Sequence, residues 1–268
     1  MNPEWEDRME LRDKPGGIPV MKQRWRELLF AHYTVYPDDV EKLLPKGVSI
    51  DTFPDAYGTE KAWIGVVPFR MEGVHPILTP SMPGLSKFAE LNLRTYVHIN
   101  GKYPAVYFFS LDAANALACK IARSWFHLPY HEANIKIERT TARSFRYRSE
   151  RRDAGAFFDC RYTVGERRGP AEPGSLEFFL LERYLLLSQN SKNELLLGRV
   201  HHKPYVYFDA KLDDWNENLS KAAGLTKSSI VHTMYCPGIN VNVFPLKSPE
   251  QVEAKLQKVR NRKAKAKA

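Results

Sequence analysis

Four polar side chains recur at every second residue of the segment 88–99. They are Glu90, Asn92, Arg94 and Tyr96, and the residues between them are mostly apolar. Because successive side chains of a strand point to opposite faces, this spacing places all four on one face. There, Arg94 could hold a carboxylate through two hydrogen bonds, Glu90 could exchange a proton if burial raised its pKa, and Tyr96 could orient a carbonyl group. The pattern fits the wall of a cavity and a surface-facing strand about equally well.

The histidines are poorly spaced for a metal site. His201 and His202 are adjacent, so on a strand they would point to opposite faces. His127 and His131 are four residues apart, but Pro129 lies between them and breaks the helix that would align them. We therefore predict no metal site, and we interpret the His201-His202 pair as one packed and one solvated side chain.

Six arginines lie between residues 139 and 152 and suggest an anion-binding face. In residues 144–148 (SFRYR), Arg146 and Arg148 share one face of a strand, while Phe145 and Tyr147 share the other. An RNA-binding sheet would instead expose its aromatic side chains beside its basic groups. The pattern favours a solvated arginine face, with contact to an anion or a nucleic acid as the alternative.

Several familiar catalytic motifs do not occur in this sequence. It contains no GxxxxGK, no GxGxxG after a strand, no GxSxG and no HExxH. These absences argue against nucleotide hydrolysis, a Rossmann cofactor site, α/β-hydrolase chemistry and zinc proteolysis. We predict no cofactor.

The surrounding sequence indicates a β-rich chain. Residues 88–99 and 105–111 flank Asn100-Gly101, which predicts an antiparallel hairpin. The clearest helix covers residues 112–125, where Leu117, Ile121 and Trp125 fall on one face. Shorter helices are expected over 37–44, 175–181 and 214–223, and further strands over 25–35, 48–53, 62–71, 133–138, 142–149, 156–164, 184–187, 195–201, 206–212, 230–235 and 240–244. Such antiparallel sheets usually close into a barrel or pack as a sandwich to remove their edges.

Composition sets the domain organisation that we expect. The chain has 268 residues, is 43% hydrophobic and carries a net charge of +9, which provides enough apolar material for a core and excludes wholesale disorder. Residues 248–268 hold seven basic and two acidic residues and form a basic tail. Residues 1–20 are polar and end in a Pro- and Gly-rich run, which predicts a mobile arm. We expect a single β domain over residues 21–247.

The sequence also indicates a cellular setting. It has no uncharged apolar stretch approaching the roughly 18 residues that a membrane span requires, and its N-terminus is too polar for a signal peptide. Its three cysteines, Cys119, Cys160 and Cys236, form no CxxC motif and no even framework. Their pattern is typical of a reducing cytoplasm.

Several strings in this order resemble the YqjF-like family, a bacterial family of unknown function. They are residues 63–69 (WIGVVPF), 90–97 (ELNLRTYV), 107–113 (YFFSLDA), 128–130 (LPY), 181–184 (LERY) and 200–202 (VHH). The resemblance spans about residues 21–247 and implies an acetoacetate-decarboxylase-like fold, an antiparallel, cone-shaped β-barrel around a polar cavity. It also implies cavity neighbours for the polar face, namely Asp112, Arg123, Tyr130, Arg183 and His201.

The resemblance does not extend to the decarboxylase lysine. That enzyme forms a Schiff base through one of two consecutive lysines. The amine of this lysine is a standard example of a nucleophile that is activated by a lowered pKa. This chain has no Lys-Lys pair, and the corresponding region holds only Lys120, on the predicted helix 112–125. We interpret Lys120 as a solvated flank. The substrate-side arginine near the first strand is also replaced, since residues 32–34 read His-Tyr-Thr.

The resulting hypothesis is a cavity that binds a small organic acid or carbonyl compound. Glu90 and Arg94 are the candidate catalytic pair, with a decarboxylase-like lyase as one form of the activity. A non-enzymatic sensor or binding protein would use the same cavity without turnover. A binder of nucleic acid or an anionic surface would rely instead on the basic tail and the arginine run.

Overall fold

Strand β5 (Phe88–Ile99) carries the predicted polar face and lies within a sheet that closes on itself. The computed structural model of the protein describes residues 2–77, 86–153, 155–226 and 228–267. Within these residues the other strands are β1 (Met21–Val35), β2 (Ser49–Ile50), β3 (Thr52–Pro54), β4 (Glu60–Pro76), β6 (Lys102–Ala113), β7 (Tyr130–Arg139), β8 (Ser144–Arg151), β9 (Phe157–Pro170), β10 (Leu185–Gln189), β11 (Leu195–His201), β12 (Val206–Glu217) and β13 (His232–Val243).

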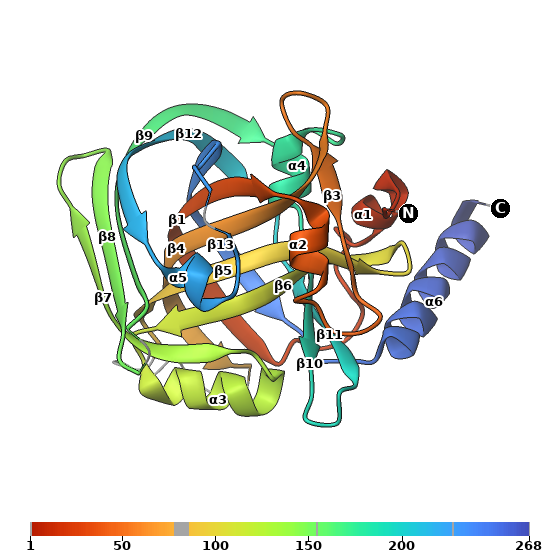
Figure 1. Cartoon of the computed structure of the whole chain (residues 1–268). Helices are drawn as coiled ribbons and strands as arrows, with labels where there is room; N and C mark the ends of the chain where they lie inside the picture. The colour runs from red at the N-terminus through yellow and green to blue at the C-terminus, as the bar shows by residue number, and fades with distance from the viewer. Residues whose placement is uncertain (1, 78–85, 154, 227, 268) are drawn as a thin grey trace.

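Five long strands form the wall on which the rest of the fold is built. They lie in the order β13-β1-β4-β5-β6, each antiparallel to its neighbour. One path returns from β6 to β13 through β7, β8, β9 and β12, and a second returns through β10 and β11 (Figure 1). This closed arrangement of strands confirms the expected β-rich, cone-like fold.

Two pairings depart from the antiparallel expectation. Strand β6 is parallel both to β7 and to β10. A parallel neighbour requires a crossover connection rather than a tight turn. Helix α3 (Ala116–Phe126) provides that crossover between β6 and β7. The parallel β6–β7 ladder therefore follows from the helix that the sequence predicts at this point, whereas the parallel β6–β10 pairing joins strands that are separated by β7, β8, β9 and α4.

The five-strand wall buries a different set of side chains on each face. Val66 and Val67 are adjacent in β4, yet Val66 packs with Leu91, Leu93 and the strands β8 and β9, whereas Val67 packs in the other cluster. Period-two alternation thus assigns consecutive residues to two separate cores. Glu90, Asn92 and Arg94 share the face of Val67.

The helices differ from the sequence prediction mainly at their ends. The structure has α1 (Trp5–Glu10), α2 (Pro37–Glu41), α3, α4 (Leu176–Leu181), α5 (Leu219–Ala222) and α6 (Pro249–Lys267). Helix α3 begins at Ala116 rather than at residue 112, because Asn115 caps it by accepting a hydrogen bond from the Ala118 amide. The helix expected over 214–223 is reduced to α5, since residues 214–217 pair with β9 instead. Tertiary pairing here overrides local propensity.

The two ends of the chain lie side by side. Where the sequence indicates a mobile arm over residues 1–20, the structure has helix α1, whose Arg8 is buried. The basic tail forms α6, which extends away from the strands (Figure 1) but packs Val252 and Leu256 against Leu11. Arg260 of α6 also binds Glu10 of α1 at 2.7 Å. The division at residues 20 and 248 remains a prediction. No helix in the described ranges is long and apolar enough to cross a membrane.

Candidate functional site

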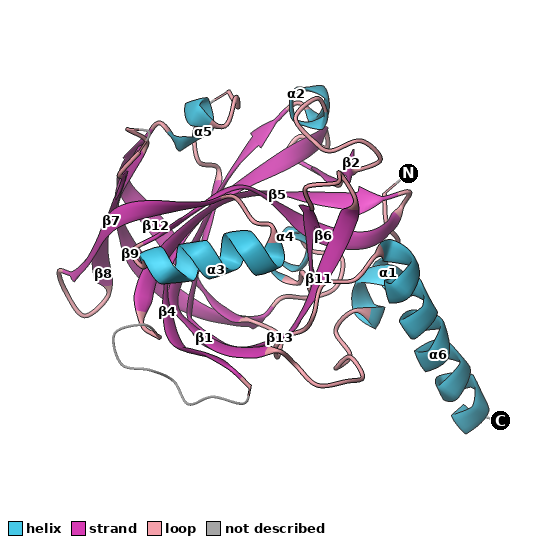
Figure 2. Ribbon diagram, turned by 90° about the horizontal axis from the view of Figure 1, so that it is seen from below, coloured by secondary structure: helices cyan, strands magenta, loops and turns pink. Residues whose placement is uncertain are grey.

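A cavity of about 450 Å³ opens on the Val67 face of the five-strand wall. Its volume lies within the ~300–1,000 Å³ that is usual for small-molecule sites. Helix α3 lies across the strands (Figure 2) and lines the cavity with Leu117, Ile121 and Trp125. Leu117 is 46% and Trp125 62% exposed, so this helix borders the opening to solvent.

The cavity wall is largely apolar, in contrast to the polar cavity that we expected. Strand side chains of the wall, such as Trp25, Phe69 and Phe108, meet the apolar face of α3 across it. From the sequence we predicted the polar residues of β5 but not these apolar ones. The sequence does not distinguish a long apolar side chain that lines a cavity from one that packs in a core. One group of polar residues lies along β5 and beside it, at Glu90, Asn92, Arg94, Tyr130 and Arg183, and Gln23, His75 and Asn115 also line the cavity.

Arg94 is a buried cation without a carboxylate partner among the described residues. It is 8% exposed, and no Asp or Glu oxygen of those residues lies within ion-pair distance of it. Its Nη2 lies 3.4 Å from both the Tyr96 hydroxyl and the Leu180 carbonyl oxygen, and its Nε has no hydrogen-bond partner. Because a buried charge is costly unless it is paired, Arg94 is suited to receive an anion from the cavity.

Gly65 makes room for this arginine. It is the cross-strand partner of Arg94, and a Cβ placed on it would lie 3.3 Å from Arg94 Cγ and 3.2 Å from His32 Nε2. These separations are tighter than ordinary van der Waals contact. A side chain at position 65 would therefore displace Arg94 or His32.

Tyr96 supports Arg94 rather than lining the cavity. Its hydroxyl donates to the Leu180 carbonyl oxygen at 3.0 Å and lies 2.8 Å from His32 Nε2. Burial, together with the nearby charges of His232 and Arg94, lowers the pKa of His32 well below its usual range, so its ring is neutral. Since the phenol proton goes to Leu180, the His32 Nε2–H donates to the phenol oxygen. We predicted that Tyr96 would orient a ligand carbonyl. Its hydroxyl instead bonds to Leu180 and His32, and Tyr96 does not line the cavity.

Asn92 lies between Arg94 and Glu90 on the cavity face. It is 6% exposed, and its Oδ1 accepts no hydrogen bond from the described residues. Buried amide groups are normally paired. An unsatisfied amide in a cavity wall is a suitable contact for a polar group of a ligand.

Glu90 is at the end of the polar row that faces α3 and β7. Tyr130 donates a hydrogen bond of 3.0 Å to Glu90 Oε2, and Tyr147 donates one of 2.8 Å to the Glu90 backbone oxygen. Burial raises the pKa of Glu90 to about 8, with the charge of Asp112 adding to the effect and the Tyr130 hydrogen bond opposing it. A carboxyl group that titrates near neutrality can act both as an acid and as a base.

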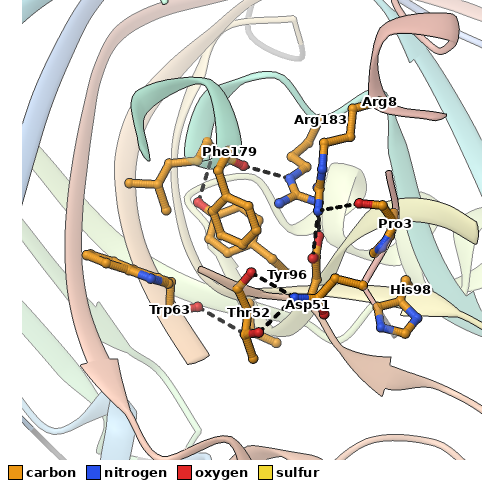
Figure 3. Close-up of polar contacts among 12 residues, drawn as sticks. Pro3, Arg8, Asp51, Thr52, Trp63, Tyr96, His98, Phe179 and Arg183 are labelled. Carbon is orange, nitrogen blue, oxygen red and sulfur yellow. Dashed lines mark hydrogen bonds and ion pairs between the residues drawn. The ribbon is translucent and has the colours of Figure 1, made fainter. Parts of the chain in front are cut away.

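Arg183 lines the cavity beside Arg94, but it is paired. Its Nη1 lies 2.5 Å from Asp51 Oδ2, and its Nε donates to the Phe179 carbonyl oxygen at 2.8 Å. Figure 3 shows that the side chains of Arg183 and Arg8 both reach Asp51. Asp51 and Arg8 were not among the site residues predicted from the sequence. No local signal connects two residues that are 43 positions apart.

The remaining predicted site residues are not brought to the cavity. Asp112 lies on the opposite face of the sheet and binds Arg151 at 2.7 Å. Arg123 points outward from α3, where it donates to the Tyr130 carbonyl oxygen. His201 does not line the cavity, and its neighbour His202 is buried against Tyr184 with ring centroids 4.6 Å apart.

No lysine of the described residues lines the cavity. Lys120 is on the exposed side of α3. The cavity therefore lacks an amine in the described part of the chain that could form a Schiff base.

Comparison with known proteins identifies relatives of unknown function. Residues 22–240 match the family model DUF2071, described as an uncharacterised conserved protein. The uncharacterised protein YqjF of Bacillus subtilis (strain 168) is 37% identical over 213 residues, which cover 79% of this chain and 85% of that protein.

Solved structures share the fold at low sequence identity. Acetoacetate decarboxylase from Legionella pneumophila has a TM-score of 0.59 at 14% identity, covering 86% of this chain and 88% of that one. An acetoacetate decarboxylase-like enzyme from Sphingomonas wittichii RW1 has a TM-score of 0.58 at 13% identity, covering 87% and 95%. The enduracididine biosynthesis enzyme MppR, complexed with pyruvate, has a TM-score of 0.57 at 14% identity, covering 86% and 90%.

Proposed function

Because this chain belongs to the DUF2071 family of uncharacterised conserved proteins and has the fold of acetoacetate decarboxylase, we propose that its cavity binds a small carboxylic acid with an apolar substituent. One observation carries this proposal. Arg94 is buried at the cavity wall without a carboxylate partner among the described residues. A ligand carboxylate would supply the missing counter-ion through charge-assisted hydrogen bonds.

The other walls fit the rest of such a ligand. The side chains of Trp25, Phe69 and Phe108 would bury an apolar substituent, which stabilises the complex by about 25 cal/mol per Å² removed from water. Glu90 is protonated below pH 8, so it does not repel the carboxylate at neutral pH. MppR, which shares the fold, was solved with pyruvate, itself a small carboxylic acid.

The test compares a carboxylate with its neutral isostere. We expect the protein to bind hexanoate more tightly than hexanamide in isothermal titration calorimetry, and to be stabilised thermally by hexanoate. Arg94→Met should lower hexanoate affinity about tenfold or more, since charged hydrogen bonds contribute about 1.5–3 kcal/mol, while hexanamide binding changes little. Arg148→Met, on the exposed side of β8, is the control. Equal affinities for hexanoate in the wild type and in Arg94→Met would refute the proposal.

A second candidate function is proton transfer by Glu90. The observation that favours it is a buried carboxyl group in the cavity wall beside the Tyr130 hydroxyl. The pKa of this carboxyl group, about 8, lets it exchange between acid and carboxylate near neutral pH. The Glu90 carboxylate would take a proton from the carbon next to a ligand carbonyl, leaving an enolate, and would return a proton to that carbon. Incubation of 2-oxohexanoate in D₂O should then replace hydrogen by deuterium at this carbon, and Glu90→Gln should abolish the exchange.

This exchange experiment also separates an enzyme from a ligand sensor. A non-enzymatic binding protein would bind 2-oxohexanoate and leave its carbon-bound hydrogens unexchanged. Borohydride treatment should give no covalent adduct in either case, because no lysine of the described residues lines the cavity. An adduct at Lys120 would overturn this expectation.

Binding of nucleic acid is less well supported. On the outer face of β8 and β9, Arg146 and Arg148 share Asp159, and Arg161 pairs with Asp214. These pairs support a solvated, largely neutralised arginine face.

The three cysteines are unpaired and buried, which supports a reducing, cytoplasmic setting for the protein.

A further inference from the structure

A buried row of charges connects the N-terminal helix α1 to the cavity wall. Arg8 of α1 binds Asp51 through two parallel hydrogen bonds, from Nη1 to Oδ2 at 2.8 Å and from Nη2 to Oδ1 at 2.7 Å. Asp51 Oδ2 also accepts the 2.5 Å hydrogen bond from Arg183 Nη1 (Figure 3). Arg183 lines the cavity. We call these three residues the Arg8–Asp51–Arg183 triad.

The triad carries an uncompensated positive charge. The side chain of Asp51 is fully buried, and although burial works to raise its pKa, the adjacent Arg183 and Arg8 hold that pKa below its usual value. Asp51 is therefore ionised, and one carboxylate serves two guanidinium groups. Burial lowers the pKa of Arg183 to about 10, which still leaves it charged at neutral pH. The triad thus has a net charge of one positive unit. This charge is buried away from water, and electrostatic interactions are stronger in the protein interior than in water.

This charge adds to that of Arg94. The guanidinium carbon atoms of Arg183 and Arg94 lie 4.8 Å and 5.7 Å from the centroid of the same Tyr96 ring. Arg183 Nη2 has no hydrogen-bond partner among the described residues. Two cations, only one of which is partly neutralised, therefore face the same end of the cavity.

Helix α1 has anchors other than Arg8. Trp5 packs edge-on against Phe178 and Phe53, with ring centroids 5.7 Å and 6.5 Å apart, and Glu10 binds Arg260 of α6. Arg8 is therefore not needed merely to hold helix α1 in place. Because Arg8 binds the same carboxylate as Arg183, we expect an electrostatic role for it.

We propose that Arg8 is a positioning residue that sets the affinity of the cavity for carboxylates. By sharing Asp51, Arg8 leaves Arg183 with positive charge that is available to the ligand. Without Arg8, the Asp51–Arg183 pair is neutral and only Arg94 attracts the anion. This inference rests on the proposed function, because it concerns the same cavity and the same class of ligand.

The experiment measures charge selectivity, defined as the Kd of hexanamide divided by that of hexanoate, by calorimetry on the full chain. Arg8→Met should lower this ratio about tenfold, as expected for one lost charge at a buried anion site. Arg8→Lys keeps the charge and should restore most of the ratio. The double variant Arg8→Met/Asp51→Asn should also restore it, because Arg183 is then freed from its partner.

Arg260→Met is the matched control for loosening of helix α1. It removes the ion pair between Glu10 of α1 and Arg260 of α6 without touching the triad, and should leave the ratio unchanged. Should Arg8→Met not fold, Asp51→Asn tests the same charge balance in the opposite direction, since loss of the shared carboxylate raises the ratio. An unchanged ratio in Arg8→Met, or no recovery in the double variant, would overturn the inference. A wild-type protein that does not discriminate hexanoate from hexanamide would instead refute the proposed function.

Discussion

The phenol of Tyr130 donates a hydrogen bond of 3.0 Å to Oε2 of Glu90 in the wall of a largely apolar cavity. The two residues are 40 positions apart and come from β7 and β5. Burial raises the pKa of Glu90 to about 8, and this hydrogen bond limits the rise. The pair therefore determines whether the cavity presents a carboxylic acid or a carboxylate.

Replacing Tyr130 by Phe should raise the pKa of Glu90 further. The lost hydrogen bond favours the ionised carboxylate, so its removal should shift the pKa upward by about one unit. Titration of the side-chain carboxyl resonances of 13C-labelled glutamate by NMR would measure the shift. Tyr147→Phe is the matched control, because Tyr147 bonds to the Glu90 backbone oxygen and not to the carboxylate. A lower pKa in Tyr130→Phe would contradict the assigned role of the hydrogen bond.

Glu90 should also make the stability of the protein depend on pH. Its pKa is about 8 in the native state against an ordinary value of 4.5. Between these values the native state binds more protons than the unfolded state, so the free energy of unfolding falls as the pH rises from 4.5 to 8. Glu90→Gln removes this contribution. Relative to wild type, the variant should gain roughly 2–4 kcal/mol between about pH 5 and about pH 9 in urea denaturation. Parallel pH profiles would exclude the expected titration.

Adjacent valines provide a test of which face of the sheet holds the cavity. Val67→Phe should fill part of the cavity, weaken hexanoate binding at least tenfold, and change the free energy of unfolding by less than about 1 kcal/mol. Val66→Phe places the same side chain in the filled core on the other face, where overpacking should destabilise the protein by about 1–3 kcal/mol. Chemical denaturation and calorimetry of both variants would measure the contrast. Equal destabilisation by the two substitutions would argue against the cavity.

The buried pair of Asp112 and Arg151 should contribute to stability and not to binding. Arg151→Met leaves Asp112 buried without its partner and should destabilise the protein by about 3–5 kcal/mol. Arg148→Met, an exposed substitution on the same strand, should cost less than about 1 kcal/mol. Thermal and urea unfolding would compare the two. A changed charge selectivity in Arg151→Met would instead place the pair in the ligand site.

Two features can be predicted directly from the sequence: the alternation of side chains between the two faces of β5, and the hairpin that joins β5 to β6. Glu90, Asn92 and Arg94 share a face because side chains of a strand alternate, whatever the rest of the chain does. Asn100 and Gly101 adopt φ angles of 50° and 71°, as the Asn-Gly turn requires. The β-rich class and the presence of a helix at α3 are likewise predicted by local patterns, whereas the parallel pairing that this helix connects is not.

Which face of β5 encloses a cavity was decided by the tertiary structure. Helix α3 and strands β10 and β11 close over the face of Glu90 and Arg94, while β8 and β9 fill the opposite face. The same closure turns Tyr96 toward Leu180 and places Asp112 on the far side of the sheet. It also brings Arg8 and Arg183, 43 and 132 positions from Asp51, onto one carboxylate. Alternation is set by the stereochemistry of a few consecutive residues, whereas the pairing of a buried charge depends on chain closure over long separations, which no local pattern encodes.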